Sequence, residues 1–443
     1  MMSGVEMGIV GFLILLTLLL IRIHIGIAMF VAAAGLYLYL GQGDVSMLMF
    51  TLNGLVYARL SNYDLAVIPF FILMGQFALN GGMSKALFKA ASSFIGHWRG
   101  GLAMSAIGSC AAFGAICGSS LATAATMGQV ALPELKKRKY SGALSTATLA
   151  AGGTLGILIP PSVPLIIYAV LTQESIGKLF VAAIIPGLLA MLGYVLVVKI
   201  LVTINPDAGP TSEKMPFKEA LKSQFQVIPI FIVFLIVIVS IYAGWANPTE
   251  SASIGAAACG VIAWLNGGLN WRGVIDSILG TATTTAMIFM VLIGADLLNS
   301  GLAITQMPNQ LAAWVVEQQF PPLLVLFTIL LIYLFLGCVM DSLAMILLTI
   351  PIFYPIIMGL DFWGLSAQDK SIWFGILALM VVEIGLVTPP VGMNLFIINK
   401  IDGETSLGQT SKWIFAFLMS DFARIALVTF VPILAYGLVH LFE

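Results

Sequence analysis

The sequence has little charge. Only 9% of its 443 residues are Asp, Glu, Lys or Arg, the formal net charge is −1, and 60% of the residues are hydrophobic. A net charge this close to zero argues against nucleic-acid binding. No soluble core needs so large a hydrophobic share, so the sequence predicts an all-α, polytopic membrane protein.

Metal-ligating and catalytic residue types are also scarce. The four cysteines show no metal-ligand spacing and the three histidines are scattered singly, which leaves zinc chemistry without support. No G-x-x-x-x-G-K-[ST] loop is present, which excludes ATP as a direct energy source. No Ser/His/Asp set and no pair of catalytic carboxylates can be assembled, so we do not expect an enzyme. The first apolar segment lacks an A-x-A-like cleavage site, and we expect it to be retained.

Apolar segments of membrane length are abundant. The sequence predicts spans at about 5–21, 25–40, 64–79, 141–171, 179–200, 227–242, 251–265, 281–298 and 372–398, and a last one ending near Leu438. Residues 46–60 are short enough to be a span or a half-helix. A helix over 83–97 carries Lys85 and Lys89 four residues apart, which favours a position in the membrane interface.

Two further apolar regions, 101–133 and 321–357, fit re-entrant hairpins. Each has two apolar arms around a small or polar middle, 114–123 in the first and 337–342 in the second. An arm of about 15 residues reaches roughly 22 Å as a helix, short of the ~30 Å bilayer core. Polar hairpin tips at membrane depth need protein or water around them, not lipid.

Two Pro-Pro pairs interrupt long apolar segments, at 156–163 and at 383–394. Adjacent prolines remove two N–H donors and release carbonyls from the helical ladder. Each freed carbonyl costs several kcal/mol in hydrocarbon unless another group coordinates it. A break of this kind lines a cavity or binds an ion, and two broken helices are typical of secondary transporters.

The two halves of the sequence repeat. Four pairs are separated by 219 positions and three by 229: Gly75/Gly294, Asn80/Asn299, Gly82/Gly301 and Gly118/Gly337, then Gly156/Gly385, Pro160/Pro389 and Pro161/Pro390. Five crossings separate the starts of the two units, so the repeats are predicted to be inverted. Lys and Arg cluster on one side, which places the first hairpin mouth on the cytoplasmic face and the second on the outer face. If residues 46–60 do not cross, only the side of the N-terminus changes.

The spans, hairpins and repeats together predict five parts of the chain. Residues 1–63 form N-terminal scaffold helices, and 64–172 form the first repeat. Residues 173–280 are scaffold helices that include the polar connector 205–224, residues 281–400 form the inverted second repeat, and residues 401–443 form a C-terminal scaffold helix.

Uncharged oxygens at the tips and breaks suit a hard cation such as Na⁺. The first candidate Na⁺ site comprises Gly118, Ser119, Ser120, Thr123, Gly156, Ile159, Pro161 and Ser162. The second comprises Gly337, Asp341, Gly385, Thr388, Pro389 and Val391. Candidate residues for a bound solute are Arg59, Ser120, Ser162, Asp341, Ser342 and Asn394.

Each of these assignments has a structural alternative. Gly/Ser tips also permit close helix packing, and Arg59 can be an interfacial arginine whose charged end reaches the headgroups. Asp341 and Glu383, and less strongly Asp296, are intramembrane carboxylates, each either functional or capped by backbone N–H groups. An ion channel is the rival function, since hairpin tips also build filters.

These motifs resemble the large membrane subunit of tripartite ATP-independent periplasmic (TRAP) transporters. The resemblance lies in Gly118–Thr126, Gly156–Ser162, Asn247–Ser251 and Glu383–Asn394 and covers nearly the whole chain. It implies a multi-pass protein of the bacterial inner membrane that imports an organic anion by an elevator motion driven by Na⁺ at two sites, without a nucleotide. It also implies a periplasmic binding protein and a small four-helix membrane subunit as partners. No such segment precedes Val5 or follows Leu438, so we expect that subunit as a separate chain.

The function predicted from the sequence is therefore sodium-coupled import of a carboxylate or sulfonate, such as sialic acid or a C4-dicarboxylate. The alternatives are proton coupling in the same fold or an ion channel.

Overall fold

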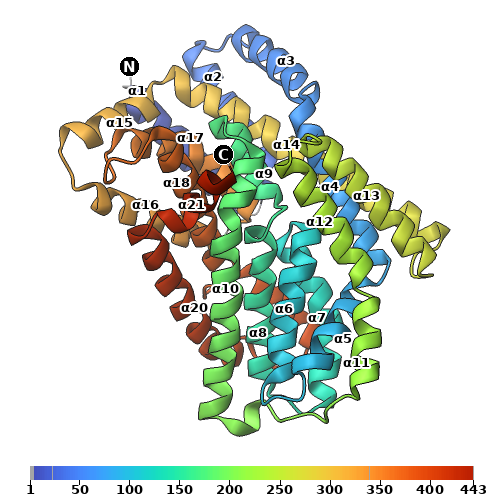
Figure 1. Ribbon diagram of the computed structural model, residues 1–443. Coiled ribbons are helices and arrows are strands. Elements are labelled where there is room, and N and C mark those ends of the chain that lie inside the picture. The colour runs from blue at the N-terminus through green and yellow to red at the C-terminus, as the bar shows by residue number, and fades with distance from the viewer. Residues whose placement is uncertain (1–3, 22, 339, 443) are drawn as a thin grey trace.

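The fold is known from a computed structural model that describes residues 4–21, 23–338 and 340–442. These residues form α-helices, with short 3-10 turns and without strands, so the prediction of an all-α protein is confirmed. Figure 1 shows a tall bundle in which α6, α8 and α10 run side by side through the centre, while α2, α3 and α14 extend along one end.

The helices have the following bounds. They are α1 Gly4–Leu20, α2 Ile25–Leu40, α3 Ser46–Leu60, α4 Val67–Asn80, α5 Met83–Ile95, α6 Gly101–Cys117, α7 Ser120–Lys137, α8 Gly142–Leu158, α9 Val163–Thr172, α10 Ile176–Ile204, α11 Phe217–Phe225, α12 Ile228–Tyr242, α13 Pro248–Leu265, α14 Trp271–Ile304, α15 Met307–Glu317, α16 Pro322–Gly337, α17 Ser342–Gly359, α18 Ala367–Gly385, α19 Met393–Asp402, α20 Leu407–Phe430 and α21 Ile433–Phe442.

By length and composition, six helical segments of the described residues can cross a membrane. They are Tyr63–Asn80, Gly142–Thr172, Ile176–Ile204, Trp271–Ile304, Ser342–Gly359 and Leu407–Phe430. The pair α11–α12, bent by 43°, is a seventh candidate. The other expected spans are helical but shorter or less apolar. α17, which the sequence predicts as a hairpin arm, is among the six, because length and composition do not separate such an arm from a span.

The structure corrects two boundaries. The last expected span, ending near Leu438, is two helices, since α20 ends at Phe430 and α21 begins at Ile433. Pro432 lies between them and has no N–H to continue the ladder. The helix expected over 281–298 is the end of α14, which has 34 residues.

Both Pro-Pro segments interrupt their helices as predicted. Residues 159–162 separate α8 from α9, and residues 386–392 separate α18 from α19. The Pro160–Pro161 and Pro389–Pro390 peptides are both cis.

The two helix–tip–helix units are also present. α6 ends at Cys117, the following Gly118 adopts a left-handed φ of 63°, and Ser119 caps α7. α17 begins after Asp341, whose Oδ1 accepts a hydrogen bond of 2.7 Å from the Ala344 N–H. The arms α7 and α17 have 18 residues each, longer than the 15 expected. Val339, in the second tip, lies outside the described residues.

The order of elements repeats with the register found in the sequence. The series α4 to α9 recurs as the end of α14 followed by α15 to α19. Thr154 of α8 and Glu383 of α18 are equivalent positions, and Oγ1 of Thr154 lies 2.7 Å from Oε1 of Glu383. The two repeats therefore meet at equivalent residues in the buried centre of the protein. Their opposite orientation in the membrane stays a prediction.

An ion pair ties the first hairpin to the end of the second broken helix. Nζ of Lys136 in α7 lies 3.1 Å from Oδ1 of Asp402 and 3.2 Å from Glu404, in the loop after α19. Burial raises the pKa of Asp402, but hydrogen bonds from Thr405 and Lys136 outweigh burial and hold the pKa below its ordinary value.

Replacing Lys136 by Met is expected to lower the Tm by a few degrees at neutral pH. The stabilisation by Asp402 is fully present above its unfolded-state pKa of about 4 and is lost as pH falls through the lower folded-state value. The Tm difference from wild type should therefore shrink in acid. Thermal unfolding across a pH series measures this, with the exposed Lys137→Met as control. A pH-independent difference would contradict the assignment.

Candidate functional site

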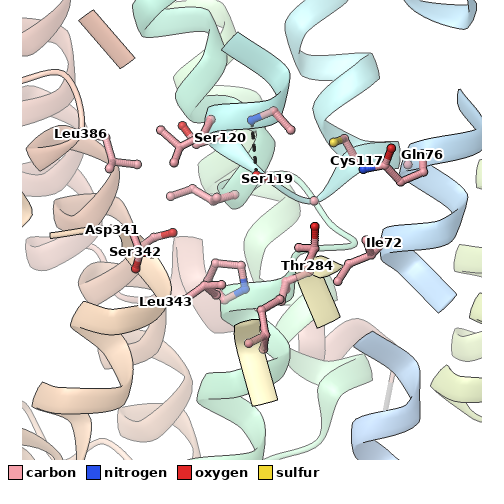
Figure 2. A pocket seen from close by; sticks show the side chains of 18 of the residues that line it. Ile72, Gln76, Cys117, Ser119, Ser120, Thr284, Asp341, Ser342, Leu343 and Leu386 are labelled. Atoms are coloured by element: carbon pink, nitrogen blue, oxygen red, sulfur yellow. Dashed lines mark hydrogen bonds between the residues drawn. The ribbon is translucent and has the colours of Figure 1, made fainter. Parts of the chain in front are cut away.

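A cavity of about 270 Å³ lies between the two hairpin tips (Figure 2). Figure 2 shows Ser119 and Ser120 on one side of this cavity, and Asp341, Ser342 and Leu343 on another. Helices α4 and α14 close it with Ile72, Gln76, Thr284 and Ile288, among others. Ile157, in the last turn of α8, and Leu386, directly after α18, are equivalent in the repeat and also line it. Tips and breaks of both repeats thus share one cavity.

The first tip packs directly against the first broken helix. A Cβ added to Gly156 would lie 2.6 Å from Oγ1 of Thr123 and 2.9 Å from the Ser119 carbonyl oxygen. A Cβ on Gly118 would lie 3.0 Å from the Pro161 carbonyl oxygen. Only glycines allow peptide and hydroxyl oxygens to come this close to the two backbones.

One unpaired oxygen lies at this contact, and a second belongs to Asn394, whose amide nitrogen bonds to Ser120 of the tip. Oγ1 of Thr123 and Oδ1 of Asn394 are both buried and unpaired among the described residues. Nδ2 of Asn394 donates to Oγ of Ser120 at 2.8 Å and to the Ala150 carbonyl at 3.2 Å. Buried polar atoms are nearly always satisfied, so this set of uncharged oxygens fits a hard monovalent cation.

The second tip meets the second broken helix in the same way. A Cβ on Gly337 would lie 2.9 Å from Cα of Gly385, and one on Gly385 would lie 3.1 Å from the Gly337 carbonyl oxygen. Oγ1 of Thr388 donates to the Ile384 carbonyl at 2.7 Å and so satisfies a carbonyl near the break. Pro389 and Val391 are half-buried, whereas Pro160, Pro161 and Ser162 of the first break are buried.

The structure divides the candidate solute residues. Ser120, Asp341 and Ser342 line the cavity, whereas Ser162 and Asn394 are fully buried and do not line it. Oγ of Ser162 donates to the Ile157 carbonyl at 2.5 Å and satisfies a carbonyl released by the break. Ile159 is half-buried beside Gly187 of α10.

Arg59 lies away from the tips. It forms an ion pair with Asp296, with its Nη2 donating to Oδ1 at 2.6 Å. It borders a separate polar cavity with Asn62, Asp64 and Glu174. The ion pair with Arg59 therefore accounts for the buried charge of Asp296.

Sequence reasoning missed two cavity residues, Gln76 and Thr284. Both are polar side chains inside apolar helices, and an intramembrane polar residue is by itself a signal for function. Their convergence on the tips depends on the contact between α4 and α14, which the sequence does not show.

A second group of buried polar residues surrounds Glu383. Nη2 of Arg424 lies 2.7 Å from Oδ1 of Asp421 and 3.3 Å from Oε2 of Glu383, and the Tyr194 hydroxyl donates to Oδ2 of Asp421 at 3.0 Å. Arg424 is buried inside the protein and paired with carboxylates of its own chain. The signal in the sequence was the pair Asp421 and Arg424, three residues apart in an apolar segment.

An all-helical membrane fold, with two broken helices meeting two polar tips around one cavity, defines the class of secondary transporters. The family described as "Tripartite ATP-independent periplasmic transporter, DctM component" matches residues 12–434. The chain belongs to this family. It is a multi-pass inner-membrane permease subunit and not an enzyme.

Two relatives illustrate the family. The C4-dicarboxylate TRAP transporter large permease protein DctM of Pseudomonas aeruginosa is 32% identical over 403 residues, which cover 89% of this chain and 92% of the relative. The sialic acid TRAP transporter large permease protein SiaM of Vibrio cholerae is 31% identical over 378 residues, which cover 84% of this chain and 85% of the relative.

The fold also resembles the YdaH transporter of Alcanivorax borkumensis, whose crystal structure is described as having an unusual topology. The TM-score is 0.59, the sequence identity is 14%, and the match covers 88% of this chain and 89% of the other. At this identity the likeness shows the fold alone.

Replacing Ser162 by Ala is expected to lower stability by about 1–3 kcal/mol, because the buried Ile157 carbonyl loses its donor. Thermal unfolding of the purified protein measures the loss. Ser92→Ala is the matched control, since that hydroxyl bonds to the Lys89 carbonyl within an intact helix at the surface. An unchanged Tm for Ser162→Ala would show that the carbonyl has another partner.

Proposed function

We propose that this chain is the large permease of a sodium-driven importer of a small organic anion, which a periplasmic binding protein delivers. The observation that carries the proposal is the pairing of each hairpin tip with a broken helix through uncharged oxygens, around one cavity. The names of the relatives, which include C4-dicarboxylate and sialic acid transporters, support a carboxylate or related anion as the solute.

Sodium is the cation that the oxygen set favours. Thr123 Oγ1, Asn394 Oδ1 and the Ser119 and Pro161 carbonyls are neutral, so a monovalent ion adds a single charge to a site without a carboxylate. When bound, the ion would coordinate peptide oxygens that otherwise have no partner in the apolar interior. The second site would use Gly337, Gly385, Thr388, Pro389 and Val391, with most ligands from the backbone, and Asp341 beside them.

The cavity suits an anion. Helices α7 and α17 begin at Ser120 and Ser342, and both residues line it. The N-terminus of a helix carries partial positive charge and N–H groups, which attract carboxylate or sulfonate oxygens. At α17 the Asp341 carboxylate already accepts the Ala344 N–H, so α7, which has a neutral cap, would attract an anion more strongly. Ser120, Ser342, Gln76 and Thr284 supply hydrogen bonds that give the solute its orientation.

Movement in this proposal is an elevator motion. Both hairpins and both broken helices move together, while residues 1–63, 173–280 and 401–443 form the scaffold. The small four-helix membrane subunit, as a separate chain, and membrane lipid would cover the exposed scaffold helices. Thermal-shift screening of candidate anions against the cognate binding protein would identify the solute.

Proton coupling is the second candidate function, and the buried carboxylates of Glu383 and Asp421 favour it. Uptake into proteoliposomes that contain both membrane subunits, with the binding protein present, separates the two. Sodium coupling requires uptake to follow an imposed Na⁺ gradient at constant pH, whereas proton coupling requires uptake to follow a pH gradient in choline buffer. Uptake that saturates at modest turnover would exclude a channel.

Replacing Pro389 and Pro390 together by Ala is expected to abolish Na⁺-dependent uptake, because a restored helix withdraws the carbonyls that the second site uses. Protein level in the membrane should persist, which immunodetection measures. Pro322→Ala, at the first position of α16, is the control, since proline there replaces no helical donor. Normal uptake in the double variant would count against the site.

Gly156→Ala is expected to remove the stabilisation by NaCl relative to choline chloride, because its Cβ would lie 2.6 Å from Thr123 Oγ1. Gly108→Ala, in α6, adds the same methyl group where no atom lies within 4 Å. Thermal unfolding in both salts measures the difference. Equal Na⁺ stabilisation of both variants would remove Gly156 from the site.

A further inference from the structure

Thr154 and Glu383 are equivalent residues of the two repeats, separated by the same 229 positions as the Pro-Pro pairs. They are also direct neighbours: Oγ1 of Thr154 lies 2.7 Å from Oε1 of Glu383, and both side chains are fully buried. Each stands two residues before the glycine that meets a hairpin tip, Gly156 in one repeat and Gly385 in the other. The helix end before one break therefore contacts the helix end before the other.

Charged and polar side chains from two further helices enclose this contact. Arg424 and Asp421 reach it from α20, and Tyr194 reaches it from α10, where its hydroxyl also lies 3.2 Å from Thr154 Oγ1. All three are buried, so the guanidinium has no water to replace a lost carboxyl partner. The ion pair with Arg424 thus fixes the Glu383 side chain against Thr154.

A continuous set of contacts leads from one candidate sodium site to the other. Ser119 and Thr123 pack closely against Gly156, and Gly156 and Thr154 both belong to α8. Thr154 is hydrogen-bonded to Glu383 of α18. Gly385, at the end of the same helix, packs closely against Gly337. A shift of either tip can therefore reach the opposite break through the Thr154–Glu383 contact, beside the contact that Asn394 of α19 makes with Ser120 of the first tip.

We propose that Thr154 and Glu383 are positioning residues that couple the two sodium sites, so that Na⁺ at one break favours Na⁺ at the other. This inference rests on the proposed function, because it needs an ion at both breaks. Neither residue touches an ion. By linkage the coupling is reciprocal, so it is read as cooperativity in Na⁺ binding.

The test is the equilibrium binding of Na⁺ to the full-length chain in detergent, measured by isothermal titration calorimetry with choline chloride holding the ionic strength constant. Wild type is expected to show a Hill slope of about two, and Thr154→Val a slope of about one, because the two sites then bind independently. Thr154→Ser restores the hydroxyl and should restore the slope. Thr154→Ala repeats the measurement if the valine variant does not fold.

Thr148→Val is the matched control. Thr148 lies in the same helix and is equally buried, but its hydroxyl has no hydrogen-bond partner among the described residues. A slope near two in Thr154→Val, or a slope near one in wild type, would overturn the coupling and leave the sodium sites standing. Absence of any Na⁺ binding in wild type would overturn the proposed function together with the coupling.

Discussion

Peptide oxygens that leave the helical ladder inside an apolar protein are the constraint on which the rest of this structure depends. Each break frees carbonyls at membrane depth, where an unpaired carbonyl costs several kcal/mol. The chain meets part of this demand itself. Ser162 donates to the Ile157 carbonyl, Thr388 donates to the Ile384 carbonyl, and the Asn394 N–H bonds to the Leu386 carbonyl at 3.0 Å. The backbone beside each break that these donors do not satisfy packs against a hairpin tip. Glycines at these contacts, such as Gly118 and Gly385, allow the close approach.

Repetition determines where these contacts fall. Because one repeat register relates the two breaks, equivalent residues meet near a common centre, as Thr154 and Glu383 do, or face one cavity, as Ile157 and Leu386 do. A single helix carrying one break would leave its carbonyls beside an unrelated surface. Two related breaks instead place two tips on opposite sides of one small space, which is the arrangement that a solute with its coupling ions requires.

The sequence predicted those features that short stretches of chain determine. A Pro-Pro pair breaks a helix whatever surrounds it, Gly118 permits a left-handed turn, and a constant offset of 219 or 229 positions reveals a repeat without any structure. The division of α20 from α21 was missed although Pro432 signals it, because the apolar pattern continues across the proline. Gln76, Thr284 and the group around Arg424 were missed for a different reason: their roles depend on which helices touch, and one sequence does not contain that information.

The two breaks differ in exposure, and the difference bears on the proposed motion. Pro160, Pro161 and Ser162 are buried, while Pro389 and Val391 are half-buried and Pro390 is exposed. Two repeats with the same secondary structure have no local reason to differ in this way, so the cause must lie in how each repeat packs against the rest of the chain. Under alternating access, a single state opens one side and closes the other, and inverted repeats would then exchange their environments between states. Under the elevator motion proposed above, the observed asymmetry would correspond to one end state.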